Sequence, residues 1–337
     1  MNAKLARGAA IATAIAAGAI IAMVERNREP EGLSEVIVEQ WQRIEGAPWL
    51  KANLSEALVY LPDRPHSRAE VEAQREGRSS SLERLRSYTV STGEMRLRGG
   101  DPGAKTEGTL RAIALGDSVT HGWGVAEEES YPNRLEQLLQ GASIPMEVVN
   151  AGVPANRVSI MRLWCERVAP ELDPDWILWT RRPDHREPNP VDAFVRSVES
   201  CRRATGAEVM VVLPPISTFD LFGQEVMEEE NEALRRRFGD EMVILDLTGP
   251  FREAQRGHGE WLERDGDEIR VVDQESGKEL FRGSRPPHDL PLEIYELFES
   301  DEEVKEHLFF DEGHPDAEGF QLFADEVFRE LGSRLER

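Results

Sequence analysis

Ser118 lies in the segment 116–124, GDSVTHGWG, which directly follows the apolar run 111–115. A serine on a tight turn between a strand and a helix presents its hydroxyl at the edge of a sheet, where it can act as a nucleophile. Gly116 permits such a turn, and the backbone N–H groups beyond it can face an oxyanion. The GxSxG pattern is absent, because Thr120 occupies its last position. Taken alone, the segment is equally compatible with a turn serine that caps a helix.

An aspartate and a histidine three residues apart, Asp311 and His314, come just before the last helical stretch of the chain. From one loop, His314 could take the proton of Ser118 while Asp311 orients the imidazole. His121 lies on the same turn as Ser118, which is a poor position for its base, and Asp117 is expected to shape that turn. Without the serine segment, an Asp-x-x-His pair is as typical of a surface loop.

The elements that must position these residues alternate from residue 109 onward. The expected strands are 111–115, 146–150, 176–180, 208–213 and 242–247, and the expected helices between them are 131–139, 156–169, 191–205 and 224–238. This alternation predicts an α/β fold with a parallel sheet of about five strands and helices on both faces, a three-layer, flavodoxin-like arrangement. Active sites of such sheets lie beyond the carboxyl ends of the strands, and Ser118 follows the first of them.

Together, the two segments resemble the SGNH (GDSL-type) hydrolase family. That family opens with Gly-Asp-Ser after its first strand and closes with Asp-x-x-His before its last helix. A third family block, Asn-x-Gly, has its match at 150–152, where the second expected strand ends. The resemblance covers about 111–330, and the lead-in from Tyr88 resembles a membrane-anchored subgroup. It implies the SGNH hydrolase fold and a triad of Ser118, His314 and Asp311.

The resemblance also implies an oxyanion hole formed by the backbone N–H groups of Ser118 and Gly152.

One block departs from the family pattern. After the third strand the family carries Gly-x-Asn-Asp, whose Asn is a further oxyanion donor, but residues 181–184 read RRPD. Pro183 stands where that Asn is expected and has neither an N–H nor a side-chain donor. Loss of one such donor typically costs about 10²–10³-fold in rate.

Polar residues near this departure are candidates for a substitute donor: Arg181, Arg182, His185 and Asn189. The two adjacent arginines could also bind an anionic group of a substrate, although a solvated loop is an equally good interpretation. Trp123 could stack on a sugar, although an aromatic residue at a sheet edge more often belongs to the core. Arg181, Arg182, His185 and Trp123 are therefore the candidate substrate contacts.

The composition excludes several classes of function. The 337 residues carry a net charge of −24, which disfavours a nucleic-acid partner. CxxC and HExxH spacings are absent, so neither a metal site nor a cofactor is expected. We interpret Cys165 and Cys201 as two buried, unbridged residues, with a single disulfide as the alternative in an oxidising compartment. The sequence indicates no oligomeric state.

The N-terminus carries a membrane-targeting pattern. Lys4 and Arg7 precede an apolar run of 17 residues, 8–24, followed by ERNR at 25–28. This pattern is typical of a signal peptide or signal anchor, at the short limit of a helix that spans a bilayer. We favour an uncleaved anchor whose basic side stays cytoplasmic, so that the rest of the chain is exported to the periplasm or the cell exterior.

Three regions follow from these patterns: a cytoplasmic tip and membrane anchor or signal segment at 1–30, a lead-in region and linker at 31–108, and the hydrolase domain at 109–337. An insertion is expected within that domain at about 248–310, containing a hairpin over 268–281 and a helix over 292–298. The lead-in is expected to contain a helix over 33–44 and a hairpin within 88–98, and the chain to end in a helix over 315–335.

The resemblance implies a serine esterase that hydrolyses an O-acyl ester. From the family and the expected export, we expect O-acetyl groups on a cell-envelope glycan, with a lipid or small ester as the second choice of substrate. Two alternatives remain: an O-acetyltransferase with the same triad, in which a sugar hydroxyl replaces water, and a non-catalytic binding domain of the same fold. The missing Asn favours the binding domain, whereas the presence of Ser118, Asp311 and His314 favours catalysis.

Overall fold

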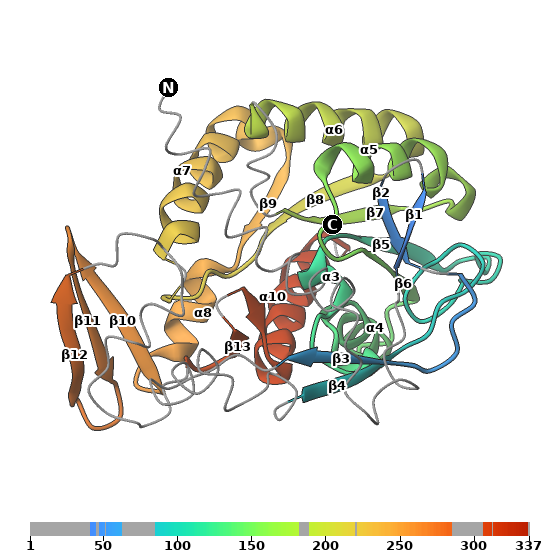
Figure 1. Ribbon diagram of the computed structural model, residues 1–337. Coiled ribbons are helices and arrows are strands. Elements are labelled where there is room, and N and C mark those ends of the chain that lie inside the picture. Colours follow the sequence, from blue (N-terminus) through green and yellow to red (C-terminus); the bar gives the residue numbers. More distant parts are fainter. Residues whose placement is uncertain are drawn as a thin grey trace.

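A five-stranded parallel sheet forms the centre of the protein (Figure 1). The computed structural model describes residues 41–44, 47–50, 52–62, 85–181, 189–219, 221–284, 306–311 and 313–335. The strands of the sheet are β5 (Leu110–Gly116), β6 (Met146–Gly152), β7 (Trp176–Thr180), β8 (Glu208–Leu213) and β9 (Val243–Asp246). Their order, β6-β5-β7-β8-β9, is that of flavodoxin-like sheets, so the predicted fold class is confirmed.

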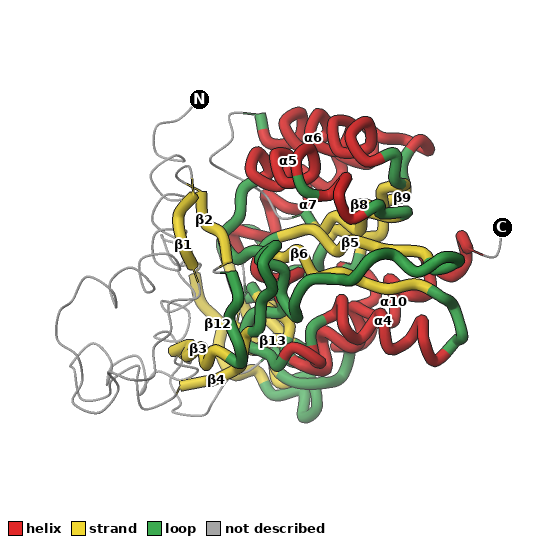
Figure 2. Tube along the Cα trace, turned by 90° about the vertical axis from the view of Figure 1, so that its right-hand side faces the viewer, coloured by secondary structure: helices red, strands yellow, loops and turns green. Residues whose placement is uncertain are grey.

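Helices cover both faces of the sheet, which gives three layers (Figure 2). One face carries α5 (Val158–Arg167), α6 (Pro190–Thr205) and α7 (Leu221–Phe238), and the other carries α4 (Tyr131–Gly141), α8 (Thr248–Gln255) and α10 (Ala317–Leu335). Along β5, Ile113 and Leu115 enter one core cluster, whereas Ala112 and Ala114 enter the other. Burial on both faces explains why this strand reads as a continuous apolar run.

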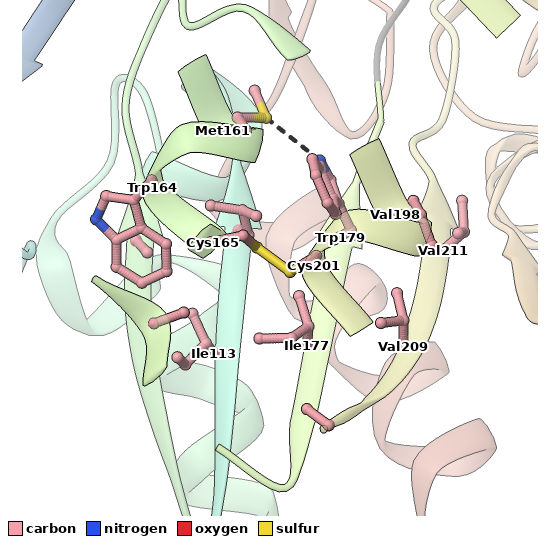
Figure 3. Packing of buried hydrophobic residues seen from close by; sticks show 14 of the residues in the cluster. Ile113, Met161, Trp164, Cys165, Ile177, Trp179, Val198, Cys201, Val209 and Val211 are labelled. Carbon is pink, nitrogen blue, oxygen red and sulfur yellow. Dashed lines mark hydrogen bonds between the residues drawn. A yellow bond between two sulfur atoms is a disulfide. The ribbon is translucent and has the colours of Figure 1, made fainter. Parts of the chain in front are cut away.

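A disulfide bond joins α5 to α6 within one of these cores (Figure 3). Cys165 and Cys201 are fully buried, and Trp179 Nε1 nearby donates a hydrogen bond to Met161 Sδ at 3.3 Å. The favoured expectation of two unbridged cysteines is therefore wrong, and the alternative is correct. Packing of the two helices brings the Cα atoms to 5.1 Å, within the range that a disulfide requires.

The first described residues form a strand pair rather than a helix. β1 (Trp41–Ile44) lies antiparallel to β2 (Ala47–Leu50), with Trp41 opposite Leu50. The expected helix over 33–44 is therefore wrong in its last four residues, because pairing with a neighbouring segment overrides helical spacing. Residues 33–40 lie outside the described part.

The later described residues of the lead-in form a second strand pair and one contact with the central sheet. β3 (Ala57–Pro62) pairs with β4 (Leu85–Val90), so the strand partner of β4 comes from earlier in the chain than expected. Only an isolated bridge between Thr92 and Arg98 corresponds to the hairpin expected within 88–98. Arg98 also bridges Asn150 of β6, which holds the lead-in against that edge strand of the sheet.

The expected insertion contributes α8 and a separate antiparallel sheet. This sheet consists of β10 (Glu260–Asp265), β11 (Glu268–Asp273) and β12 (Glu279–Ser284). β11 and β12 correspond to the predicted hairpin, whereas β10 was not predicted. Leu262, Ile269 and Val271 form its small core with Phe219. The expected helix over 292–298 lies outside the described residues.

The predicted membrane segment, residues 8–24, also lies outside the described residues. Among the helices that are described, none is long and apolar enough to cross a bilayer. The anchor therefore stays a prediction.

Candidate active site

Ser118 is the first residue of α3 (Ser118–His121), which starts where β5 ends. Asp117 caps this short helix, because its Oδ1 accepts the N–H of Val119 at 3.0 Å and its carbonyl accepts that of His121 at 2.9 Å. Asp117 thus holds the turn in shape, as its position in the sequence suggested. Within the described part of the chain, the N–H of Ser118 donates no hydrogen bond, so it is available to an oxyanion.

Asp311 and His314 face each other across the short antiparallel pair β13 (Phe309–Asp311) and β14 (His314–Pro315). His314 Nδ1 lies 2.9 Å from both carboxylate oxygens of Asp311, and Nε2 lies 2.8 Å from Ser118 Oγ. The N–H of Gly313 donates to Asp311 Oδ1 at 2.7 Å and so holds the carboxylate in place. The structure thus joins the three residues of the predicted triad by hydrogen bonds.

Aromatic rings enclose the imidazole of His314. The ring of Phe310 stacks on it at 5.6 Å between centroids, and the half-buried Trp123 lies 6.0 Å away. Trp123 in turn contacts Tyr88 of β4 at 6.4 Å. The candidate substrate contact Trp123 therefore lies beside the predicted base, and the lead-in contributes to this wall of the site.

Gly152 lies beneath α3, where β6 ends. Its N–H donates to Asn150 Oδ1 at 3.0 Å, and its carbonyl lies 3.3 Å from His121 Nδ1. A Cβ atom at this position would overlap the backbone of Thr120 and His121. The predicted oxyanion role of Gly152 does not fit this geometry, because its N–H is already engaged and its missing side chain serves to let α3 approach the sheet.

Ala155, three residues after Gly152, is a second candidate for an oxyanion donor. It lies on the turn that follows β6, which Asn156 closes by donating its N–H to the Val153 carbonyl at 3.0 Å. Ala155 is exposed, has a φ of 57°, and donates no backbone hydrogen bond within the described residues. The Asn-x-Gly block ends before Ala155, and alanine gives no sequence signal for a positive φ, so the sequence did not point to this residue.

Arg181 follows β7 but is buried between the helices of one layer. It is 2% exposed, pairs with Glu230 of α7, and lies 5.5 Å from the centroid of the Phe194 ring. The predicted contact of Arg181 with a substrate is therefore wrong, because its charge is neutralised inside the core. Arg182, Pro183 and His185 lie outside the described residues, and Asn189 is the N-cap residue of α6.

Two buried polar side chains lie in or beside α3: those of His121 and Tyr131. Burial holds the pKa of His121 well below its usual value, so its imidazole is neutral. Burial also raises the pKa of Tyr131 to about 12, and its hydroxyl lies 2.9 Å from Thr180 Oγ1.

Among the described residues, no cluster of histidine, cysteine, aspartate or glutamate could hold a metal ion.

The sequence from residue 114 to residue 322 matches the model of the GDSL-like lipase/acylhydrolase family, and this stretch contains Ser118, Asp311 and His314. The chain belongs to this family. The match starts inside β5, so the lead-in strands β1 to β4 of this GDSL-like acylhydrolase lie outside it.

Solved structures similar to this GDSL-like acylhydrolase include a member of the lipolytic G-D-S-L family from Veillonella parvula (17% identity, 66% of this chain, 97% of that chain, TM-score 0.43). An acetyl xylan esterase shows 15% identity over 66% of this chain and 100% of its own, with a TM-score of 0.44. A variant of an acetyl-xylooligosaccharide esterase from Geobacillus stearmophilus shows 15% identity over 66% of this chain and 94% of its own, with a TM-score of 0.44. Among curated proteins no match was found.

Proposed function

We propose that this GDSL-like acylhydrolase is a serine esterase that removes an O-acyl group, expected to be acetyl, from a cell-envelope glycan. The observation that carries the proposal is the hydrogen-bonded series Ser118–His314–Asp311, with 2.8 Å between Ser118 Oγ and His314 Nε2. A hydroxyl, an imidazole and a carboxylate in this order are what acyl transfer through a serine requires.

Each step of the reaction uses one of these contacts. Asp311 accepts the Nδ1–H of His314, so the lone pair on Nε2 faces the Ser118 hydroxyl. As Ser118 Oγ bonds to the ester carbonyl, its proton moves to Nε2 and then to the leaving alcohol oxygen when the ester C–O bond breaks. Water, deprotonated by the same imidazole, then releases the acyl group and restores Ser118.

The oxyanion of each tetrahedral intermediate needs donors at the end of β5. The N–H of Ser118 is at the start of α3, where helix N–H groups have no intrahelical partner. We assign the second donor to the N–H of the exposed residue Ala155 on the turn after β6. Preorganised backbone donors of this kind stabilise the transition state without needing to reorient.

The substrate class and the location rest on separate observations. Trp123 lies half-buried beside His314, and its ring could stack on the face of a sugar. The Cys165–Cys201 disulfide is typical of an oxidising compartment, which supports export. Together with the apolar run 8–24, it favours a membrane-anchored enzyme that acts outside the cytoplasm.

The test compares the full-length chain with Ser118→Ala. We expect the wild type to hydrolyse 4-nitrophenyl acetate and to release acetate from acetylated polysaccharide, and the variant to do neither. A fluorophosphonate probe should label only the wild type. If neither protein turns over and the probe fails as well, the esterase proposal is wrong. Labelling of Ser118 without hydrolysis would instead favour the acetyltransferase alternative.

A further inference from the structure

Arg98 belongs to the lead-in, outside the residues that match the family, yet its side chain ends at the nucleophile turn. We propose that Arg98 is a positioning residue that holds α3, and with it Ser118, in the reactive geometry. The inference rests on the proposed esterase function and adds a part of the chain that the family motifs do not include.

The guanidinium of Arg98 binds the backbone that leaves α3. Nη1 donates to the carbonyls of His121 and Gly122, the latter at 2.8 Å, and Nη2 donates to that of Val125 at 2.9 Å. Arg98 is only 3% exposed, so water does not compete for these carbonyls. The last carbonyls of a helix lack intrahelical partners and carry partial negative charge. A buried cation supplies the missing hydrogen-bond donors and offsets this charge.

Helix α3 depends on such external support because it has only four residues. A helix of this length is not stable by itself, since one turn fixes several dihedral angles for very few hydrogen bonds. The cap of Asp117 holds its start, and Arg98 holds its end. Ser118 lies between these two supports, so a shift of either end would move Oγ relative to His314.

Arg98 is itself fixed to the central sheet. Its N–H donates to the Asn150 carbonyl of β6 at 3.2 Å, so one residue connects the edge strand to the nucleophile turn. Gly122 has a φ of 80°, and a Cβ atom there would lie 2.5 Å from Ser130 Cβ and 2.7 Å from Arg98 Nη1. Gly122 of the serine segment therefore leaves the space that the guanidinium of Arg98 occupies.

The same lead-in also reaches the base. The guanidinium carbon of Arg98 lies 5.4 Å from the centroid of the Tyr88 ring, Tyr88 contacts Trp123, and Trp123 contacts His314. Residues of the segment 88–98 thus contact the nucleophile turn directly and the base through Trp123. Because a misplacement of about 1 Å can cost about 10²-fold in rate, loss of Arg98 should act on turnover.

The experiment compares Arg98→Met with Arg111→Met in the full-length chain. Arg111 is a matched control, because it is 2% exposed and donates to the carbonyls of Leu172 and Gly103, both at 2.7 Å, at the other end of β5. Both variants should lose thermal stability. Below both melting temperatures, only Arg98→Met should lose kcat, by about 10²-fold, with KM nearly unchanged and a parallel fall in the rate of fluorophosphonate labelling.

Arg98→Lys covers the case in which Arg98→Met does not fold. One ammonium group cannot replace the two-pronged contact with three carbonyls, so we expect a kcat between those of the wild type and Arg98→Met. Wild-type kcat in Arg98→Lys and Arg98→Met, or an equal loss in Arg111→Met, would overturn the positioning role. If the wild type shows no turnover that depends on Ser118, the esterase proposal falls and the positioning role falls with it.

Discussion

His314 Nε2 lies 2.8 Å from Ser118 Oγ although 196 residues separate the two in the sequence. The contact forms because β5 delivers Ser118 to the carboxyl edge of the sheet, and the segment before α10 returns to that edge. Leu308 and Phe309 anchor this segment in the core cluster that also contains Phe320 of α10. The geometry of the triad therefore depends on the packing of the last helix as well as on the serine motif.

Asp311→Asn should abolish most activity without unfolding the protein. An amide can donate to Nδ1 and so favours the wrong tautomer of His314, and in a comparable triad such a change costs about 10⁴-fold in kcat. Asp316→Asn is the control, because Asp316 lies in the same loop but its Oδ1 accepts the N–H of Gly319 at 2.9 Å. Steady-state kinetics should give near wild-type kcat for Asp316→Asn, and equal losses in the two variants would contradict the assignment of Asp311.

Gly152→Ala tests two roles of Gly152 against each other. The sequence predicts an oxyanion donor, whereas the geometry supports a position that lets α3 approach the sheet. A purely backbone donor would survive this change, because alanine keeps the N–H. A Cβ atom at Gly152 would instead overlap Thr120 and His121, and overpacking of this kind typically costs about 1–3 kcal/mol. We expect lower stability in denaturant titrations and reduced kcat, because α3 must shift.

Gly141→Ala provides the control for that substitution. Gly141 is the last residue of α4, and a Cβ atom there would meet nothing within 4 Å. The free energy of unfolding of the Gly141→Ala variant should equal that of the wild type or exceed it by up to about 1 kcal/mol, since alanine favours the helix more than glycine does. Wild-type stability and kcat in Gly152→Ala would show that the packing argument is wrong.

Reduction of the Cys165–Cys201 bond should weaken the fold but leave catalysis intact. The bond closes a loop with a sequence separation of 36, and loop-closure entropy for that length corresponds to about 3–4 kcal/mol. Both cysteines lie in the α5–α6 layer (Figure 3), away from the triad at the edge of the sheet. Urea titrations with and without dithiothreitol measure the loss, and kcat of the folded, reduced protein should match that of the oxidised one.

A thiol assay checks the premise of this prediction. In denaturant without reductant, the full-length protein should show no free thiol, because its two cysteines are both in the bridge. Two free thiols per chain would restore the interpretation of unbridged, buried cysteines and would remove one support for export.

The sequence predicted the central sheet well because burial on both faces leaves a clear signal. β5 and β8 read as short apolar runs, and their ends in the structure lie within about a residue of the predicted ones. The segment Trp41–Ile44 was mispredicted because the spacing of its apolar residues fits a helix, whereas its strand partner is set by tertiary pairing.

The site was predictable where a motif fixes the chemistry, as it does for Ser118 and His314. Three-dimensional contacts decided the rest. The N–H of Gly152 donates to a side chain two residues away, and Arg181 pairs with Glu230 of α7, 49 residues further along the chain. The spacing of the motifs reveals neither contact. Arg98 was missed because its partners are backbone carbonyls, which any sequence supplies.

Tyr131→Phe should change how stability depends on pH in alkaline solution. Burial raises the pKa of Tyr131 to about 12 in the folded protein, whereas an unfolded tyrosine titrates near pH 10. Between these values the unfolded chain releases a proton that the folded chain keeps. The stability that Tyr131 contributes is therefore fully present below pH 10 and is lost as the pH rises toward 12.

The measurement is the free energy of unfolding of both proteins at several pH values from 8 upward. At pH 8 Tyr131→Phe should be less stable by about 1 kcal/mol, because the hydroxyl no longer contacts Thr180 Oγ1. Above pH 10 the wild type should lose about 1.4 kcal/mol per pH unit relative to the variant, so the difference should narrow and then change sign. All other ionisable groups are common to both proteins and cancel in this comparison, so parallel curves up to pH 12 would mean that Tyr131 titrates in the folded protein as it does in the unfolded chain.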